Sequence, residues 1–537
     1  MKSFEVKNFK SIATLQNVPI KPITLIYGAN SSGKSSIIHS FLLLNDIMRT
    51  GNGDINLISA SWDNLDIGGF SQYIYKHDYK NQLIFKIKLS NLENTEIILE
   101  IKSKTSDIGE ALLDTTAFIN TFEIIIQETK LIKFLKIEQE DLYDIQYFNE
   151  NHSLWKEYIK EILNPNLNFN ELYPLIVNNI KLNLNKFIKS HSINNFNFDA
   201  INNSFEILEI KSFDEEIKLF KDFISGIFNN SYKNFWNEMD TSLNSINYIG
   251  PLRDYPPRII SNENKNNQNK TWSILLENED VRNKINKWMG NEQFMNPSYE
   301  FSVEHKVNPE KIVTEIINLI SNINILGNYV PEELDRIFQI QKELNENEQE
   351  ILNLSTNSYD SKDISQLIKF LLNKNHESFY SQLNLIDRRT KTNVSLRDVG
   401  VGISQILPVL VNAYSSNNKI VAIEQPELHL HPKLQSELAD VFIENAIGEN
   451  KKTFLIETHS EHLLLRIMRR IKETTHNSLQ DDNLKITAND VQILFVMPSI
   501  NNEGSVIKKI NLDKNGEMID KWPGGFFEEG FKERFGF

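Results

Sequence analysis

The amino-terminal part of the chain carries short apolar runs followed by a helical pattern. Residues 3–9 and 22–27 are rich in β-forming side chains, which predicts two strands. Behind Lys34 the apolar positions recur at helical spacing, which predicts a helix. From Gln82 apolar positions alternate with polar ones, so an antiparallel meander is expected. The alternating positions are Phe85, Ile87, Leu89, Ile97, Leu99, Ile101, Phe122, Ile124 and Ile126.

The rest of the chain divides into an asparagine-rich middle and a carboxyl-terminal part with alternating strand and helix signals. Roughly residues 140–380 have mostly helical spacing and include a candidate helical arm at 331–354. After about residue 394 the strand KIVAIE, a helix from Pro432, the strand TFLIET and a helix through Ile471 follow one another. This alternation is typical of parallel strands joined by crossover helices.

Together these patterns predict the α/β class: one α/β domain with an antiparallel β subdomain, split by a large, mainly helical insertion. The expected parts are an N-terminal lobe at 1–135, the insertion at 136–380, a C-terminal lobe at 381–485 and a tail at 486–537.

Composition narrows the class of protein. The chain has 537 residues, no cysteine, 20 glycines and 15 prolines, which excludes collagen-like chains, disulfide scaffolds and thiolate metal sites. Its formal net charge of −15 argues against a nucleic-acid-binding polycation, so DNA contact would need a local basic patch or a partner. No signal core or membrane-length apolar run is present in the sequence, so we expect a cytoplasmic bacterial protein without membrane contact.

Because glycine is scarce, close glycine pairs are informative. Gly28 and Gly33 lie in GANSSGKSS, which matches the P-loop pattern (Walker A) between a predicted strand and a predicted helix. In such a loop backbone N–H groups cradle phosphates, Lys34 reaches the β- and γ-phosphates of ATP, and the Ser35 hydroxyl binds Mg²⁺. The candidate nucleotide-binding residues here are Gly28, Ala29, Asn30, Ser31, Ser32, Gly33, Lys34, Ser35 and Ser36.

A second glycine pair lies in SLRDVGVGISQILPVLV. Gly400 and Gly402 precede an apolar helix, which is a further candidate phosphate cradle, although a plain strand-to-helix turn explains the same pattern. Ser404 and Gln405 follow in the same segment and complete the candidate nucleotide-binding set.

The segment KIVAIEQPELHLHP is an apolar strand that ends in an acid, which is the Walker B pattern. Glu424 is the candidate Mg²⁺ carboxylate. Gln425 stands where a general base is expected, and Glu427 follows two residues later. His429 and His431 are interpreted as packing or interface residues, because alternate positions beside a proline define no ligand geometry.

The next strand, TFLIET, ends at His459. Its strand-end position favours a nucleotide-sensing role, which completes the catalytic candidates Gln425, Glu424, Glu427 and His459. The helix that follows carries Arg466, Arg469 and Arg470 on one face; they are either a solvated face or a patch for the phosphate backbone of nucleic acid.

In this order along the chain, the motifs resemble the heads of ABC-type ATPases, above all the SMC, RecF and OLD-type ATPases. The opening FEVKNFKSIATLQNVPIKPITLIYGANSSGKSS, the segment YIGPLRDYPPR (248–258), IEQPELHLHP and WPGGFFEE (522–529) are similar to a bacterial subgroup of SMC-like AAA ATPases with a tail domain of unknown function. The resemblance extends to ATPase subunits of antiphage systems, such as PtuA of Septu and AriA of PARIS.

This resemblance implies an ATPase whose heads pair as a homodimer or higher oligomer around ATP, the P-loop of one head facing the Gly400–Gln405 signature of the other. The chain departs from the pattern at two positions: Gly400 replaces the usual signature serine, and Gln425 replaces the usual acid. Glutamine accepts no proton, and losing a general base costs a factor of about 10²–10⁴. Either Glu427 or a partner supplies the base, or turnover is slow and the ATP-bound clamp is the working state; slow turnover is favoured.

Two cellular tasks from different classes remain open. The first is regulation of a separately encoded nuclease or toxin in antiphage defence, with no nuclease in this chain, because VQILFVMPSINNEG lacks the D-x-D cluster of a Toprim domain. The second is DNA repair or chromosome maintenance of RecF or RecN type, with a basic patch at Arg466, Arg469, Arg470 and the segment 388–391. A transporter-associated ATPase is disfavoured, because no membrane-coupling motif is identified.

Overall fold

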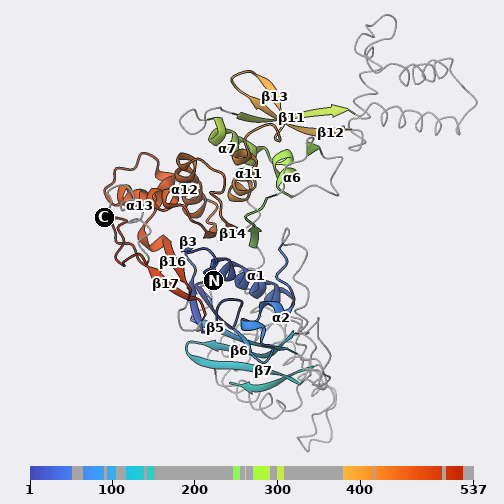
Figure 1. Ribbon diagram of the computed structural model, residues 1–537, viewed down its shortest axis with the longest axis vertical. Helices are drawn as coiled ribbons and strands as arrows, with labels where there is room; N and C mark the ends of the chain where they lie inside the picture. The colour runs from blue at the N-terminus through green and yellow to red at the C-terminus, as the bar shows by residue number, and fades with distance from the viewer. Residues whose placement is uncertain are drawn as a thin grey trace, which may run out of the picture. The chain divides into compact units, whose positions relative to one another are not determined.

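The computed structural model describes thirteen stretches of the chain, which fall into two compact units. One unit is formed by 1–254 together with 405–537, and the other by 255–404. Figure 1 shows the described elements in colour. The described residues are 1–50, 65–89, 94–103, 117–137, 142–149, 152, 246–253, 260–261, 270–290, 299–307, 379–415, 419–498 and 504–523.

A six-stranded sheet forms the centre of the first unit. All its neighbouring strands pair in parallel except β16 and β17, which are antiparallel. The P-loop strand β3 lies between β15 and β16, and the Walker B strand β14 is the next one beyond β15. From edge to edge the order is β17 (Val506–Ile510), β16 (Val491–Met497), β3 (Ile23–Gly28), β15 (Thr453–Glu457), β14 (Ile420–Glu424) and β9 (Ile246–Ile249).

Helices cover both faces of this sheet because successive strand residues point to opposite faces. Leu455 of β15 joins the same buried cluster as α1 (Lys34–Thr50), whereas its neighbour Phe454 packs against Phe442 of α12 (Pro432–Ile447), with ring centroids 5.1 Å apart. The helix α13 (Glu461–Thr475) packs on α12 and is capped by Ser460, whose hydroxyl accepts the N–H of Leu463.

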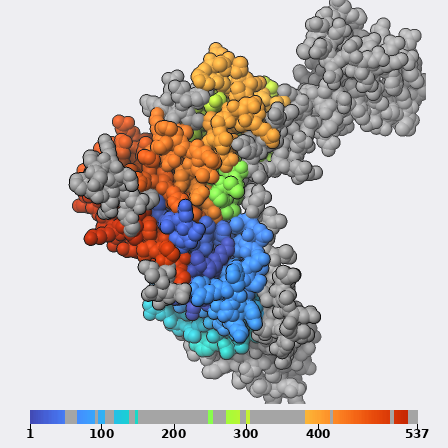
Figure 2. Space-filling model, in the orientation of Figure 1, coloured from blue at the N-terminus to red at the C-terminus, as the bar shows by residue number. Residues whose placement is uncertain are grey.

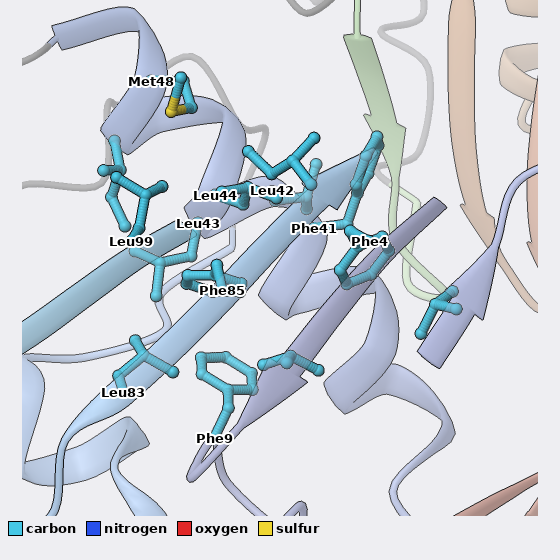
Figure 3. Packing of buried hydrophobic residues seen from close by; sticks show 14 of the residues in the cluster. Phe4, Phe9, Phe41, Leu42, Leu43, Leu44, Met48, Leu83, Phe85 and Leu99 are labelled. Carbon is cyan, nitrogen blue, oxygen red and sulfur yellow. The ribbon is translucent and has the colours of Figure 1, made fainter. Parts of the chain in front are cut away.

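A seven-stranded antiparallel sheet packs on the other side of α1. In β4 and in the middle of β5 the buried positions are apolar and alternate with half-buried or exposed ones, as the period-two pattern predicts, whereas β6 is buried on both faces. Figure 3 shows side chains of α1 meeting Phe4 of β1, Phe85 of β4 and Leu99 of β5 in one core. The order is β2 (Gln16–Pro19), β1 (Ser3–Lys7), β4 (Leu83–Lys88), β5 (Thr95–Ser103), β6 (Ala117–Ile126), β7 (Thr129–Ile137) and β8 (Leu142–Phe148).

Residues far apart in sequence lie side by side in the first unit. In the space-filling view the amino-terminal residues, in blue, border the carboxyl-terminal residues, in red (Figure 2), and β3 pairs directly with β16. The short elements of this unit are α2 (Phe70–Tyr73) and the 3₁₀ turns η1 (Tyr75–His77), η6 (Asp482–Leu484) and η7 (Ala488–Asp490).

The described part of the second unit contains a small antiparallel sheet, two helices and the first turn of a third. Asn286 of α7 bonds both backbone polar groups of Phe301 in β11, at 2.7 and 2.8 Å, which fixes the helix against the strand. The helix α11 begins in this unit and continues into the first. The elements are β10 (Ile260–Ser261), α6 (Lys270–Glu277), α7 (Glu279–Gly290), β11 (Tyr299–Val307), β12 (Phe379–Asp387), β13 (Thr392–Val394) and α11 (Val401–Tyr414).

The α/β class and the antiparallel subdomain are confirmed, but the expected boundaries differ from the observed ones. The insertion expected at 136–380 contributes β9 to the parallel sheet, and its described residues include strands as well as helices. The tail expected at 486–537 contributes β16 and β17 to the same sheet. The arm at 331–354 and residues 524–537 lie outside the described residues. No helix of the described part is long and apolar enough to cross a membrane.

Candidate nucleotide-binding site

The P-loop lies where the sequence predicts it, between β3 and α1. Gly28, Ser31 and Gly33 have φ angles of 151°, 58° and 99°, and the positive values favour glycine at two of these positions. A Cβ on Gly28 would collide with the carbonyl oxygen of Val496, and one on Gly33 with the hydroxyl of Ser11. The crown of the loop is open to solvent; its exposed residues are Ala29, Asn30 and Ser31.

The ammonium group of Lys34 is held by its own loop. Its Nζ donates to the carbonyl oxygens of Gly28 at 3.2 Å and Ala29 at 2.9 Å, and it lies 3.9 Å from Oε1 of Glu457. Burial lowers the pKa of Lys34, while the charges of nearby carboxylates oppose this shift. A buried cation is thus poised at the floor of the loop.

Ser35 points to a carboxylate that the sequence reasoning did not single out as functional. Its hydroxyl donates to Oε2 of Glu457 at 2.7 Å. Glu457 is only 4% exposed; burial first, then the charge of Glu424, raises its pKa to about 7. The parallel register places Glu457 directly opposite Glu424, so an acid at the end of each of two adjacent apolar strands was the signal that could have found it.

Glu424 is held in place by two donors. His39 Nε2 lies 2.9 Å and the Tyr248 hydroxyl 3.0 Å from its Oε1. Lys10 Nζ lies 2.6 Å from His39 Nδ1 and can only donate. We therefore assign the tautomer in which His39 Nδ1 accepts and Nε2–H donates to Glu424. The carboxylate and the charge of Lys10 are linked through one imidazole ring.

Arg253 fixes the backbone after the Walker B strand. It is 9% exposed, and its guanidinium donates to the carbonyl oxygens of Gln405 at 2.9 Å, Glu424 at 3.0 Å and Gln425 at 3.2 Å. In return, the Gln405 amide donates to the carbonyl oxygen of Arg253 at 3.0 Å. From the sequence, the segment YIGPLRDYPPR was noted only as a family resemblance, with no role for Arg253. Gln405 was expected at the nucleotide, whereas in the structure its side-chain amide binds Arg253.

The position of Gln425 is set by its backbone. Its φ is 45° and its N–H donates to the carbonyl oxygen of Glu457 at 2.8 Å, so the chain turns sharply as it leaves β14. Gln425 therefore lies beside the two acidic strand ends, where the missing base is expected.

Glu427 and His459 lie together at the neighbouring turn. Oε1 of Glu427 accepts the backbone N–H of His459 at 2.6 Å. Burial raises the pKa of the Glu427 carboxyl and lowers that of the His459 imidazole, to which the charge of Lys34 also contributes. Within the described part of the chain, the buried Nε2 of His459 has no hydrogen-bond partner.

The second glycine pair lies in the other unit. Gly400 precedes α11, whose first residue is Val401, as the turn-to-helix reading predicts. The Ser404 hydroxyl donates to the carbonyl oxygen of Val401 at 2.9 Å. A Cβ on Gly400 would meet no atom within 4 Å, so nothing in the described part of its own chain requires glycine there. Gly402 lies in the first turn of this helix.

His429 and His431 show no metal site. The ring of His431 accepts the N–H of Lys433 at 3.3 Å and caps α12, and His429 has a φ of 64° in the preceding turn. Among the residues that the structure describes, no three His, Asp or Glu side chains form a metal-binding group.

The arginines that could have formed a basic patch are paired with acids. Arg466 and Arg470 both lie 2.7 Å from Asp440, and Arg469 lies 2.6 Å from Glu473. In the segment 388–391, Arg388 and Arg389 pair with Glu300 and Asp387 at 3.0 and 2.8 Å. Each of these five arginines thus has an acidic partner in the same chain, although Arg466 and Arg470 share Asp440.

The residues present fit Mg²⁺-ATP. The loop offers backbone N–H groups and a buried ammonium, and the buried Ser32 Oγ and His459 Nε2 have no partner among the described residues. Mg²⁺ keeps several waters and phosphate oxygens and needs only one or two protein ligands, which Ser35 and Glu424 can supply. Ser36 lies behind the loop, with its Oγ 3.3 Å from that of Ser11.

Comparison with known families agrees with this geometry. Residues 1–464 match the model of a family described as AAA ATPase domain. The chain belongs to this family of ATPase domains. Residues 486–534 match a second family, described only as a protein of unknown function. No curated protein matches the chain.

Solved structures similar to this member of the AAA ATPase domain family include SMC heads. The SMC head domain from Thermotoga maritima shows 9% identity and a TM-score of 0.31 over 95% of this chain and 99% of that one. An Smc head with an extended coiled coil, bound to the C-terminal domain of ScpA and derived from Pyrococcus furiosus, shows 11% identity and a TM-score of 0.32 over 99% and 98%. The fold itself is defined by the order of the strands in the parallel sheet and by the P-loop between β3 and α1.

Proposed function

We propose that this chain is a slowly hydrolysing ATPase head that associates with a second copy around ATP and thereby controls a separately encoded effector. The observation that carries the proposal is the replacement of the expected base by Gln425, beside a P-loop whose Lys34 and Ser35 are in place. The site holds the groups needed to bind Mg²⁺-ATP but lacks the usual proton acceptor.

The chain's own residues divide the work. The loop from Gly28 to Ser36 binds phosphate oxygens through its N–H groups, and Lys34 exchanges its loop carbonyls for the β- and γ-phosphates. Ser35 and Glu424 hold Mg²⁺, and the bound ion neutralises charge on the phosphates. His39 and Tyr248 keep the Glu424 carboxylate in one orientation.

Water activation is the weak step in this proposal. The Gln425 amide orients a water but accepts no proton. One carboxylate oxygen of Glu427 is already engaged, because it accepts the backbone N–H of His459. Glu457, with its pKa near 7, is the remaining carboxylate beside Ser35. Turnover then proceeds slowly, and the ATP-bound state persists as the signal.

The exposed turn at Gly400, before α11, is the surface that we expect a second copy of the chain to contact. Gly400 is exposed and its surroundings leave room for another molecule to approach. In the ATP-bound pair, Gly402 of one copy completes the site of the other, whereas Ser404 is fully buried and its hydroxyl donates to Val401 within its own helix.

The decisive experiment is a mass measurement by light scattering with ATP and Mg²⁺, with ADP, and without nucleotide. A doubled mass with ATP alone supports the proposal; the same mass in all three conditions contradicts it. Repeating the run with Lys34→Ala provides the control, because that variant keeps the surface but loses the phosphate contact.

The effector role is inferred from the resemblance to antiphage ATPases and from the absence of a D-x-D cluster in 491–504. Purification from the native host should yield a nuclease or toxin bound to the head, and the effector's activity should change with ATP. DNA-stimulated, salt-sensitive turnover of the purified chain would instead favour the repair or chromosome-maintenance class. The paired arginines on α13 argue against that alternative.

A further inference from the structure

We propose that the carboxyl-terminal segment matched by the family of unknown function is a built-in support of the P-loop, with Ser505 as the positioning residue. The inference goes beyond the proposed function, on which it rests only in assuming that the loop binds a nucleotide. It assigns to this segment a role inside the nucleotide site rather than that of a separate tail.

Ser505 contacts the P-loop directly. Its hydroxyl donates to the carbonyl oxygen of Ser32 at 2.6 Å, and its N–H donates to the carbonyl oxygen of Ser11 at 2.7 Å. Ser505 is 3% exposed, so water does not compete well for these bonds. One residue of the tail therefore fixes the loop and the turn that lies behind it.

The neighbouring Gly504 shows how closely the tail approaches. Its φ is 75°, and a Cβ there would lie 2.5 Å from the carbonyl oxygen of Ser11 and 2.6 Å from the nitrogen of Ala13. Gly504 also forms an isolated bridge with Ile12. Only glycine allows the backbone to pass at this distance and to present Ser505 to the loop.

The strand β16 supports the loop from a second direction. It runs parallel to β3, and Val496 is the register partner of Gly28, the first residue of the P-loop. The carbonyl oxygen of Val496 fills the space that a side chain on Gly28 would occupy. The tail thus lies against the loop at its first residue and again at Ser32.

Trp522 extends the contact to the turn that bears His459. Its ring meets those of Tyr27 and Phe495 edge-on, with centroids 5.2 and 5.3 Å away. Tyr27 is buried, and its hydroxyl donates to the carbonyl oxygen of Ser460, the residue after His459. The Tyr27 side chain therefore connects Trp522 of the tail with the turn that carries His459.

The physical reason for such support is the conformation of the loop. Gly28, Ser31 and Gly33 all have positive φ values, which a free chain populates only in part. Contacts that hold this conformation before nucleotide arrives reduce the ordering cost of binding. The tail therefore contributes to affinity without touching the nucleotide.

The test compares Ser505→Ala with Ser505→Cys, which retains size and a weak donor, and with Ser478→Ala, whose serine is exposed and far from the loop in sequence. A fluorescent ATP analogue with Mg²⁺ is titrated into each protein. Losing one buried hydrogen bond should raise the Kd about three- to tenfold in Ser505→Ala, less in Ser505→Cys and not at all in Ser478→Ala. A Kd for Ser505→Ala equal to that of the unmodified protein would overturn the proposal.

Hydrogen exchange without nucleotide keeps this test separate from the proposed function. The amides of residues 31–34 should exchange faster in Ser505→Ala, while those of β14 stay unchanged. Exchange that rises everywhere, or nowhere, would mean that Ser505 only stabilises the fold or does nothing at the loop. If the unmodified protein fails to bind ATP, the proposed function fails, and the exchange result alone decides the role of Ser505.

Discussion

Ser35 donates its hydroxyl hydrogen to Glu457 at 2.7 Å, although the two residues are 422 positions apart in the chain. This bond joins the first turn of α1 to the end of β15 and places a buried carboxylate beside the predicted Mg²⁺ serine. The acid expected there from the Walker B pattern, Glu424, is one strand further along and is bound by His39 and Tyr248. The site thus has two strand-end acids with different partners.

Replacing Gln425 by glutamate should raise turnover. The carboxylate restores a proton acceptor at the end of β14, and a general base is worth a factor of about 10²–10⁴. Steady-state phosphate release measures the effect, and we expect an increase of at least about tenfold. Gln480→Glu, at an exposed glutamine, is the matched control. Turnover that is unchanged or lower in Gln425→Glu would count against slow hydrolysis as the consequence of Gln425.

Replacing Lys34 by alanine should abolish tight nucleotide binding. The buried ammonium lies on the carbonyl oxygens of its own loop and supplies the positive charge for the phosphates. We expect the Kd for ATP to rise at least about a hundredfold in a titration with a fluorescent analogue. Lys419→Ala removes an exposed lysine and should bind normally. Equal affinities in the two variants would show that the loop does not bind phosphate.

Replacing Glu457 by glutamine should stabilise the fold above neutral pH. Burial raises the pKa of this carboxyl from 4.5 to about 7, so ionising it lowers the free energy of unfolding as pH rises between these values. The shift in pKa corresponds to a difference of at most about 3 kcal/mol in the free energy of unfolding. This difference should favour Glu457→Gln over the unmodified protein at pH 8 and should be small at pH 4.5. Glutamine keeps an oxygen for the Ser35 hydroxyl.

Urea unfolding at pH 5 and pH 8 measures this difference. The exposed Glu449→Gln should show no such pH dependence. A gain for Glu457→Gln that is the same at both pH values would contradict the assignment of the raised pKa to this group. A loss of stability at pH 8 would mean that the ionised carboxylate supports the fold.

Replacing Tyr248 by phenylalanine should weaken the use of Mg²⁺. The change removes one of two donors to Glu424 while the ring stays. Partners that orient a metal-binding carboxylate are worth about 10–100-fold in metal affinity. The Mg²⁺ concentration for half-maximal turnover should therefore rise by about tenfold, whereas Tyr79→Phe, at an exposed tyrosine, should leave it unchanged. If the Mg²⁺ concentration for half-maximal turnover does not rise in Tyr248→Phe, Glu424 is not a ligand of the metal ion.

Local patterns in the sequence were sufficient for the elements around the P-loop and for the strands of the antiparallel meander. The alternation in Phe85 to Ile87 and the helical spacing behind Lys34 correctly predicted β4 and α1, because side-chain periodicity records which face is buried. The glycines at 28 and 33 marked a backbone with positive φ. Such patterns depend on a few neighbouring residues, so they can be interpreted without knowing the fold.

Other parts of the site could not be predicted in this way. Arg253 and Tyr248 lie in a segment assigned to the insertion, yet β9 brings them to Glu424. Nothing in the spacing of residues 246–253 indicates that they pair with β14, because a parallel partner can come from any distance along the chain. The expected tail boundary at 486 coincides with the start of the second family match, but its strands β16 and β17 join the parallel sheet, which no local pattern indicated.

The sequence by itself determined the chemistry that the chain carries: a phosphate-binding loop, a strand that ends in Glu424, and a glutamine where a base is expected. Only the tertiary structure decided which groups surround that loop. Glu457 accepts a hydrogen bond from Ser35, and Ser505 donates one to Ser32, which is 473 positions away in the chain. These contacts form because the parallel strands β16, β3 and β15 are neighbours in the sheet, so that their carboxyl ends lie side by side. Periodicity reports burial and local conformation, whereas such neighbours depend on pairing between strands, which no local pattern records.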